Sequence, residues 1–107
     1  MNKMQINEYR LDDFGHSEKA IWLVGCWSYP RLETRYTNFF IPISQVALKH
    51  NRVFIPQWLV DSINKEHRLT QYKYSFPTVL KTYNVSESKW DEFKRLYKYN
   101  YTKPLGI

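Results

Sequence analysis

Residues 20–27 read AIWLVGCW, and residues 34–41 read TRYTNFFI. Both stretches are short, rich in β-branched and aromatic side chains, and flanked by turn-forming residues, which is typical of strands buried in a sheet. Pro30 lies between them and cannot donate a hydrogen bond to a strand ladder, so the first strand ends before it. These segments predict two strands, the first of them central in its sheet.

A hairpin is expected next along the chain. Residues 45–49 and 52–55 carry apolar side chains at every second position, which is typical of a strand pair with one buried face. The connection between them is His50-Asn51. Asn tolerates the left-handed conformation that a tight hairpin turn requires, so we expect Asn51 to adopt it.

Two helices are predicted. Pro56 suits a first helical turn because its missing N–H falls where a helix has no partner for it, and an amphipathic stretch of about ten residues follows. A second helix is expected over residues 87–99, where acidic residues come first and basic residues last, in agreement with the helix dipole. Ser86 or Ser88 can cap its start. Its apolar face would consist of Trp90, Phe93, Leu96 and Tyr97.

Three other segments carry weaker signals. Residues 1–18 predict a short strand or an irregular arm that ends in a turn. Residues 69–76 alternate like an edge strand, and residues 78–83 fit either a helix or a loop.

Together these elements predict one α+β domain over residues 1–107. We expect a small, twisted, mostly antiparallel sheet with a short helix after Pro56 and a C-terminal amphipathic helix. The predicted core consists of Ile21, Leu23, Phe40, Val46, Val53, Ile55, Trp58, Leu59, Trp90, Phe93 and Leu96.

The composition excludes several classes of protein. The chain has 107 residues, of which 43% are hydrophobic and 18% aromatic, and it contains neither an apolar run that could span a membrane nor a secretory signal. Cys26 is the only cysteine, so an intramolecular disulfide is excluded and a reducing, cytoplasmic location is expected. The apolar neighbours of Cys26 favour a buried, unreactive thiol.

Residues that perform catalysis do not cluster in the sequence. His16, His50 and His67 are isolated from one another and lack the short spacings of metal ligands. Three glycines are too few for a loop that cradles phosphates. We therefore expect a protein that is not an enzyme and that uses no metal or cofactor.

Positive charge is concentrated towards the C-terminus. Residues 1–64 carry seven basic and six acidic side chains, whereas residues 65–107 carry nine and four. Residues 97–103 interleave aromatic rings with lysines, a composition typical of single-stranded nucleic-acid binders, although tyrosines in such a stretch also pack in cores. The candidate nucleic-acid-binding residues are Lys94, Arg95, Lys98, Tyr99, Tyr101 and Lys103.

The loop after the first predicted strand is the other candidate site. A loop on a rigid β scaffold is a natural recognition element, and Trp, Tyr and Arg are enriched at interface hot spots. The candidate partner-binding residues are Tyr29, Arg31, Arg35 and Tyr36. These residue types suit a protein partner and a nucleic-acid backbone equally.

Three stretches resemble a pattern of small bacteriophage and mobile-element proteins. These are residues 18–21 (EKAI), 40–46 (FIPISQV) and 53–60 (VFIPQWLV), which are similar to the order KAI, then aromatic-IPxSQ, then IPxWL in that group. The resemblance covers about two-fifths of the chain. The chain departs from the pattern at Ile43, where a lysine is usual, in the aromatic insertion over residues 26–38, and in its basic C-terminal extension.

The resemblance implies a phage-type accessory protein without enzymatic activity. Such proteins dock on a host protein or ribonucleoprotein complex, as anti-CRISPR and other anti-defence inhibitors do, and no membrane is involved. Our first hypothesis is therefore a protein that binds and blocks a host complex that handles nucleic acid in the host cytoplasm. The alternative hypothesis is a protein that binds single-stranded DNA or RNA directly. Neither hypothesis specifies an oligomeric state.

Overall fold

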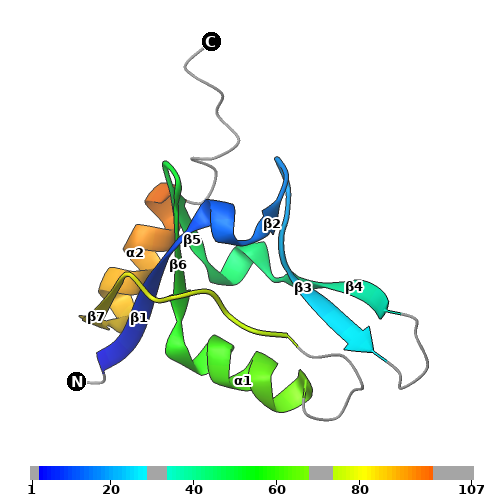
Figure 1. Ribbon diagram of the computed structural model, residues 1–107. Helices are drawn as coiled ribbons and strands as arrows, with labels where there is room; N and C mark the ends of the chain where they lie inside the picture. The colour runs from blue at the N-terminus through cyan, green and yellow to red at the C-terminus, as the bar shows by residue number, and fades with distance from the viewer. Residues whose placement is uncertain (1–2, 29–33, 68–73, 98–107) are drawn as a thin grey trace.

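The computed structural model describes residues 3–28, 34–67 and 74–97. In these ranges, seven strands and two α-helices form an α+β fold with two antiparallel sheets (Figure 1). The predicted fold class is therefore confirmed. No helix among the described residues is long and apolar enough to cross a membrane.

Sheet A has four strands in the order β5-β6-β1-β7. Its strands are β1 (Lys3–Arg10), β5 (Ala47–Lys49), β6 (Arg52–Pro56) and β7 (Lys81–Ser86). β1 is antiparallel to both of its neighbours, with Tyr9 opposite Val53 of β6 and Ile6 opposite Tyr83 of β7. The N-terminal segment is thus a full interior strand.

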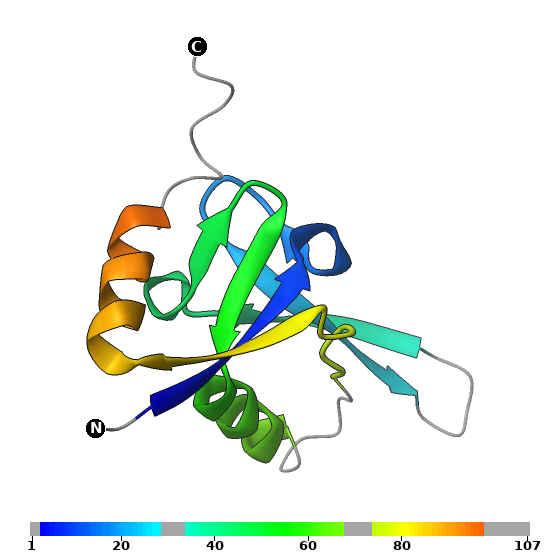
Figure 2. The same cartoon turned by 90° about the vertical axis from the view of Figure 1, so that its left-hand side faces the viewer.

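Sheet B has three strands in the order β2-β3-β4. Its strands are β2 (Gly15–His16), β3 (Ile21–Ser28) and β4 (Thr34–Ile41). β3 is central and β4 spans residues 34–41, as the sequence predicts. In both views the β3–β4 hairpin extends from the side of the molecule opposite helix α2 (Figures 1 and 2).

The predicted hairpin forms between β5 and β6, with Lys49 opposite Arg52. The residue with positive φ is His50, at 56°, and not Asn51 as predicted. Asn51 has a different role, because its carbonyl accepts a hydrogen bond from the Leu11 N–H at 2.8 Å. This bond connects the hairpin turn to the end of β1.

Both predicted helices are present. α1 (Gln57–His67) begins directly after Pro56, and α2 (Glu87–Tyr97) begins directly after Ser86. Ser86 provides the cap, since its Oγ accepts a hydrogen bond from the Lys89 N–H at 3.3 Å. Figure 2 shows β7 running straight into α2, so the cap lies at the junction of the two elements.

Side chains from the two faces of sheet A belong to two separate apolar clusters. One cluster joins Tyr9 and Ile55 of sheet A to residues of sheet B and α1, such as Leu23 and Ile63. The other joins Ile6, Ala47 and Phe54 of sheet A to residues of α2. Its α2 members are Trp90, Phe93 and Tyr97. The layers are therefore α2, then sheet A, then sheet B with α1.

Asn7 is the buried polar residue of β1, with 2% of its surface exposed. Its Nδ2 donates a hydrogen bond to Gln57 Oε1 at 2.5 Å, and its Oδ1 accepts one from Thr82 Oγ1 at 3.0 Å. Both ends of the amide are thus paired, which removes the cost of burying it. The role of Asn7 is to hold β1, the start of α1 and β7 together.

Three residues of the predicted core are exposed instead. Phe40 is 57% exposed because Phe39 points into the core, and successive strand residues point to opposite faces. Trp58 on α1 is 49% exposed and Leu96 on α2 is 61% exposed. In α1 the next residue, Leu59, packs into the core instead of Trp58. In α2, Phe93 lies one turn before Leu96 and Tyr97 directly after it, and these two side chains pack against sheet A.

The sequence interpretation of residues 69–83 also requires correction. Residues 74–76 are not in a strand, and residues 69–73 lie outside the described part of the chain. Residues 81–83 begin β7, neither helix nor loop. β7 is stabilised by pairing with β1, where Lys81 lies opposite Glu8. A partner so distant in sequence leaves no local pattern.

Candidate functional site

The predicted partner-binding residues belong to the β3–β4 hairpin. Arg35 and Tyr36 lie in β4, opposite Trp27 and Cys26 of β3. Their side chains lie outside the described part of the structure, as does the Cys26 side chain. Tyr29 and Arg31 also lie outside the described residues.

Two of the predicted nucleic-acid-binding residues are described, Lys94 and Arg95, in consecutive positions of α2. Lys94 Nζ lies 3.8 Å from Asp91 Oδ1 and 5.9 Å from the centre of the Trp90 ring. Lys94 is therefore partly engaged with its own helix, whereas Arg95 is exposed. The remaining residues, Lys98, Tyr99, Tyr101 and Lys103, lie outside the described part of the chain.

Apolar side chains are exposed on the face of sheet B that points away from the core. Trp22 and Val24 of β3 and Phe40 of β4 lie on this outer face, together with the exposed Asn38 opposite Val24. Val24 is 54% exposed, and the rings of Trp22 and Phe40 lie 5.3 Å apart at an interplanar angle of 55°. An antiparallel sheet with one face in water normally carries polar side chains on that face. The outer face of sheet B therefore requires an explanation other than folding.

Trp22 is held in place by a close contact with β2. Gly15 lies opposite Trp22 in the register, and a Cβ atom at position 15 would overlap the indole ring. Gly15 thus leaves the space that the indole occupies beside the neighbouring strand. This contact explains why Trp22 is only partly exposed while Val24 and Phe40 are more open.

Few cations accompany this aromatic surface. Residues 15–28 and 34–41 contain two lysine or arginine residues, Lys19 and Arg35. The nearby His16 Nε2 lies 3.2 Å from Asp12 Oδ1, which offsets any charge that His16 carries. The described side chains on the outer face of sheet B are consequently mostly apolar, and none of them is a lysine or arginine.

A cavity of about 280 Å³ lies on the opposite side of the molecule, between α2 and sheet A. We call it the α2 cavity. Its apolar wall comes from the three strands β1, β6 and β7 and from α2, and one lysine each from β5 and α2 completes the lining. The lining residues are Ile6, Phe54, Tyr83, Val85, Trp90 and Phe93, with Lys49 and Lys89.

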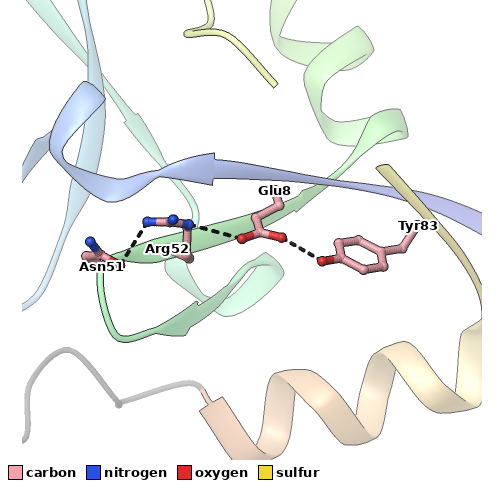
Figure 3. Close-up of polar contacts among 4 residues, drawn as sticks. All are labelled: Glu8, Asn51, Arg52 and Tyr83. Carbon is pink, nitrogen blue, oxygen red and sulfur yellow. Dashed lines mark hydrogen bonds and ion pairs between the residues drawn. The ribbon is translucent and has the colours of Figure 1, made fainter. Parts of the chain in front are cut away.

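A row of polar contacts crosses sheet A next to this cavity (Figure 3). Tyr83 Oη donates a hydrogen bond to Glu8 Oε1 at 2.6 Å, and Arg52 Nε donates one to Glu8 Oε2 at 3.1 Å. Arg52 also donates to Asn51 Oδ1 at 2.9 Å. The hydrogen bond to Glu8 is the main reason that the pKa of Tyr83 is raised; burial and the Glu8 charge add to it. The Glu8 carboxylate is therefore fully engaged within the protein.

Further lysines lie around the aromatic residues on this side of the molecule. Lys49 Nζ is 4.9 Å from the centre of the Tyr97 ring, and Lys81 Nζ is 5.1 Å from the centre of the Tyr83 ring. At these distances the ammonium groups contact the electron-rich faces of the rings. Four lysines, Lys49, Lys81, Lys89 and Lys94, thus lie on the α2 side of sheet A, and the exposed aromatic residues of sheet B lie on the other side.

Sequence reasoning missed both surfaces. The outer face of sheet B was missed because Phe40 was assigned to the core. The α2 cavity was missed because its lining comes from β1, β5, β6, β7 and α2, and the pairing of β1 with β6 and β7 is not evident from local patterns. The usable signal was the pair Phe39-Phe40, since alternation allows only one of these rings to point into the core.

The described residues contain no group of three or more His, Cys, Asp or Glu side chains that could hold a metal ion. Comparison of the chain with protein-family models, with curated protein sequences and with solved structures found no match in any of the three.

Proposed function

We propose that this chain is a non-enzymatic accessory protein of bacteriophage type. It binds and blocks a host protein or ribonucleoprotein complex that handles nucleic acid, in the manner of an anti-CRISPR or other anti-defence inhibitor, and it acts in the host cytoplasm. The observation that carries the proposal is the exposed apolar outer face of sheet B, formed by Trp22, Val24 and Phe40.

The position of this face supports docking on another macromolecule. It belongs to a hairpin that extends from the body of the molecule (Figure 1), and residues 29–33 connect the two strands. Exposed aromatic side chains contribute most to protein interfaces when they are grouped on a rigid element. β3 and β4 supply such an element, since they pair over eight residues each. Tyr29, Arg31, Arg35 and Tyr36 would extend the contact along the hairpin.

The scarcity of cations on this face favours a protein partner. A single strand of nucleic acid is bound by stacked rings together with a positive groove. On this molecule the rings of Trp22 and Phe40 are on one side, and Lys49, Lys89 and Lys94 are on the other. An apolar surface rimmed by few charges fits the interior of a protein interface better. Acidic regions of the partner would still be attracted by the net charge of +6.

Direct binding of single-stranded nucleic acid is the second candidate function. The observation in its favour is the placement of Trp22 and Phe40 on neighbouring strands of an open sheet, because aromatic rings on a sheet surface stack well on unpaired bases. In that case Arg31, Arg35 and the C-terminal basic residues would supply the phosphate contacts.

A phage-challenge assay tests the proposed function. The chain is expressed in bacteria with an active CRISPR–Cas system, and plating of a targeted phage is measured. We expect the chain to raise plating and the Val24→Ser/Phe40→Ser variant to lose this effect. Leu96→Ser is the matched control, because it also removes an exposed apolar side chain, from α2, and should remain active. Equal activity of both variants would remove the outer face of sheet B from the proposal.

Direct contact is tested by cross-linking. A photoreactive amino acid at position 24 should capture a component of the defence complex, whereas the same group at the exposed position 64 of α1 should not. The second candidate function is distinguished from protein docking by fluorescence titration with mixed-sequence single-stranded oligonucleotides, at about 50 and then about 200 mM salt. Saturable binding that falls steeply with salt would replace the protein-docking proposal by nucleic-acid binding.

A further inference from the structure

We infer that the α2 cavity binds a small organic anion, namely a monocarboxylate with a compact apolar body. The apolar body would lie among Ile6, Phe54 and Trp90, and the carboxylate would face Lys49 and Lys89. The site is on the side of the molecule away from the outer face of sheet B, so the inference is independent of the proposed function.

The size of the cavity sets the size of the ligand. A volume of about 280 Å³ equals the share of about nine water molecules in the liquid. A ligand with about ten non-hydrogen atoms would occupy it, which is smaller than most drug-sized molecules. The wall is dominated by side chains that cannot hydrogen-bond water, including Val85 and Phe93. Replacing that water with an apolar group is therefore favourable.

The two lysines define the charge of the ligand. Among the described residues, no carboxylate lies within ion-pair distance of Lys49 or Lys89. Lys49 contacts the Tyr97 ring, a weak interaction that leaves its charge unneutralised. An ammonium group beside an apolar cavity attracts an anion more strongly than it would in open water, because the cavity wall excludes solvent on one side.

Glu8 does not compete for these lysines. Its carboxylate accepts hydrogen bonds from Tyr83 Oη and Arg52 Nε, and its side chain is only 15% exposed (Figure 3). The Arg52 guanidinium offsets its negative charge. The Tyr83 hydroxyl is likewise engaged, by its hydrogen bond to Glu8. The lining thus combines six apolar or aromatic side chains with two lysines, which is the complement of an amphipathic anion.

The probe for this site is 3-phenylpropanoate, and the neutral control is 3-phenylpropan-1-ol. Binding is followed by NMR through the indole N–H signals of the four tryptophans, each assigned with a Trp→Phe variant. We expect the Trp90 signal and the Val85 methyl signals to shift saturably with the carboxylate, and nuclear Overhauser effects to connect the phenyl ring to Val85. The alcohol should bind more weakly.

Lysine variants test the charge assignment. Lys49→Gln and Lys89→Gln should each weaken binding of the carboxylate by up to about fivefold, the upper end of the effect of a surface ion pair, and leave binding of the alcohol unchanged. Lys65→Gln is the matched control, since it removes the same charge from exposed α1, and it should have no effect.

Two results would overturn the inference. Equal binding of alcohol and carboxylate, or equal effects of Lys65→Gln and the two cavity variants, would show that the site does not select an anion. A Trp90 signal that stays unchanged at millimolar probe would show that the cavity does not bind this class of ligand. Because the lysines are not part of the apolar core, all three variants are expected to fold.

Discussion

Replacing Tyr83 by Phe removes the hydroxyl that bonds to Glu8 and leaves the ring in place. The Tyr83–Glu8 contact is short, at 2.6 Å, and its acceptor is a carboxylate. Hydrogen bonds to charged groups contribute about 1.5–3 kcal/mol when fully enclosed. Tyr83 is half-buried and Glu8 keeps its contact with Arg52. We therefore expect Tyr83→Phe to lower the free energy of unfolding by about 1 kcal/mol at about pH 7.

The same contact makes this cost depend on pH. The pKa of Tyr83 is raised, first by its hydrogen bond to Glu8 and then by burial and the Glu8 charge. The folded chain thus holds the phenol proton more tightly than the unfolded chain, in which tyrosine titrates near about pH 10. The stabilisation is complete below that pH and is lost as the pH rises through the raised value. The difference in stability between wild type and Tyr83→Phe should shrink above about pH 10.

Urea unfolding followed by tryptophan fluorescence measures this difference at each pH. A loss of about 1 kcal/mol corresponds to a midpoint lower by about 0.5 M, for a slope of about 2 kcal/mol per molar. The other tyrosines, including Tyr9, whose pKa is raised by burial, are common to both proteins and cancel. Glu8→Gln is the control background, since Tyr83→Phe should cost less there and show less pH dependence. A difference that stays constant with pH, or equal costs in both backgrounds, would refute the reasoning.

Three further predictions concern stability. Gly15→Ala places a Cβ in the Trp22 ring, and should cost about 1–3 kcal/mol and change the near-ultraviolet circular dichroism of the indole. Trp90→Ala empties the centre of the cluster between α2 and sheet A, so we expect a loss of about 3–5 kcal/mol and faster amide exchange in α2 than in β6. Ser86→Ala removes the cap of α2 and should cost about 0.5–2 kcal/mol in urea unfolding, whereas Ser88→Ala should cost less because the Lys89 N–H bonds to Ser86.

The elements with strong local periodicity could be predicted from the sequence. β3, β4, the β5–β6 hairpin and both helices lie where apolar spacing, proline and capping residues indicate. These signals arise within about ten residues of one another, the range over which side-chain pattern and turn chemistry act. The hairpin turn lies where the sequence predicts it, but the residue with positive φ is His50 and not Asn51.

The pairing of β1 with β7 could not be predicted in the same way. β7 reads KTYNVS and carries little apolar signal. Its position follows from hydrogen bonds to β1, such as Leu80 N–H to the Glu8 carbonyl at 2.8 Å, and from Thr82 bonding to the buried Asn7. Pairing between distant segments depends on the whole fold and not on strand propensity. The α2 cavity depends on that pairing, so it was missed as well.

Exposed aromatic residues were the main source of error in the predicted core. A large ring in a strand-like stretch is buried in most proteins, so Phe40 was assigned to the interior. Sheet A agrees with that rule, because it is covered on both faces and each face carries an apolar cluster. Sheet B is covered on one face only, yet its open face carries Trp22, Val24 and Phe40.

A fold gains nothing from apolar groups that stay in water, and grouped exposed apolar residues promote association. Selection for folding alone would place polar residues there. The exposure of Val24 and Phe40 is therefore the feature of this fold that supports the proposed docking surface.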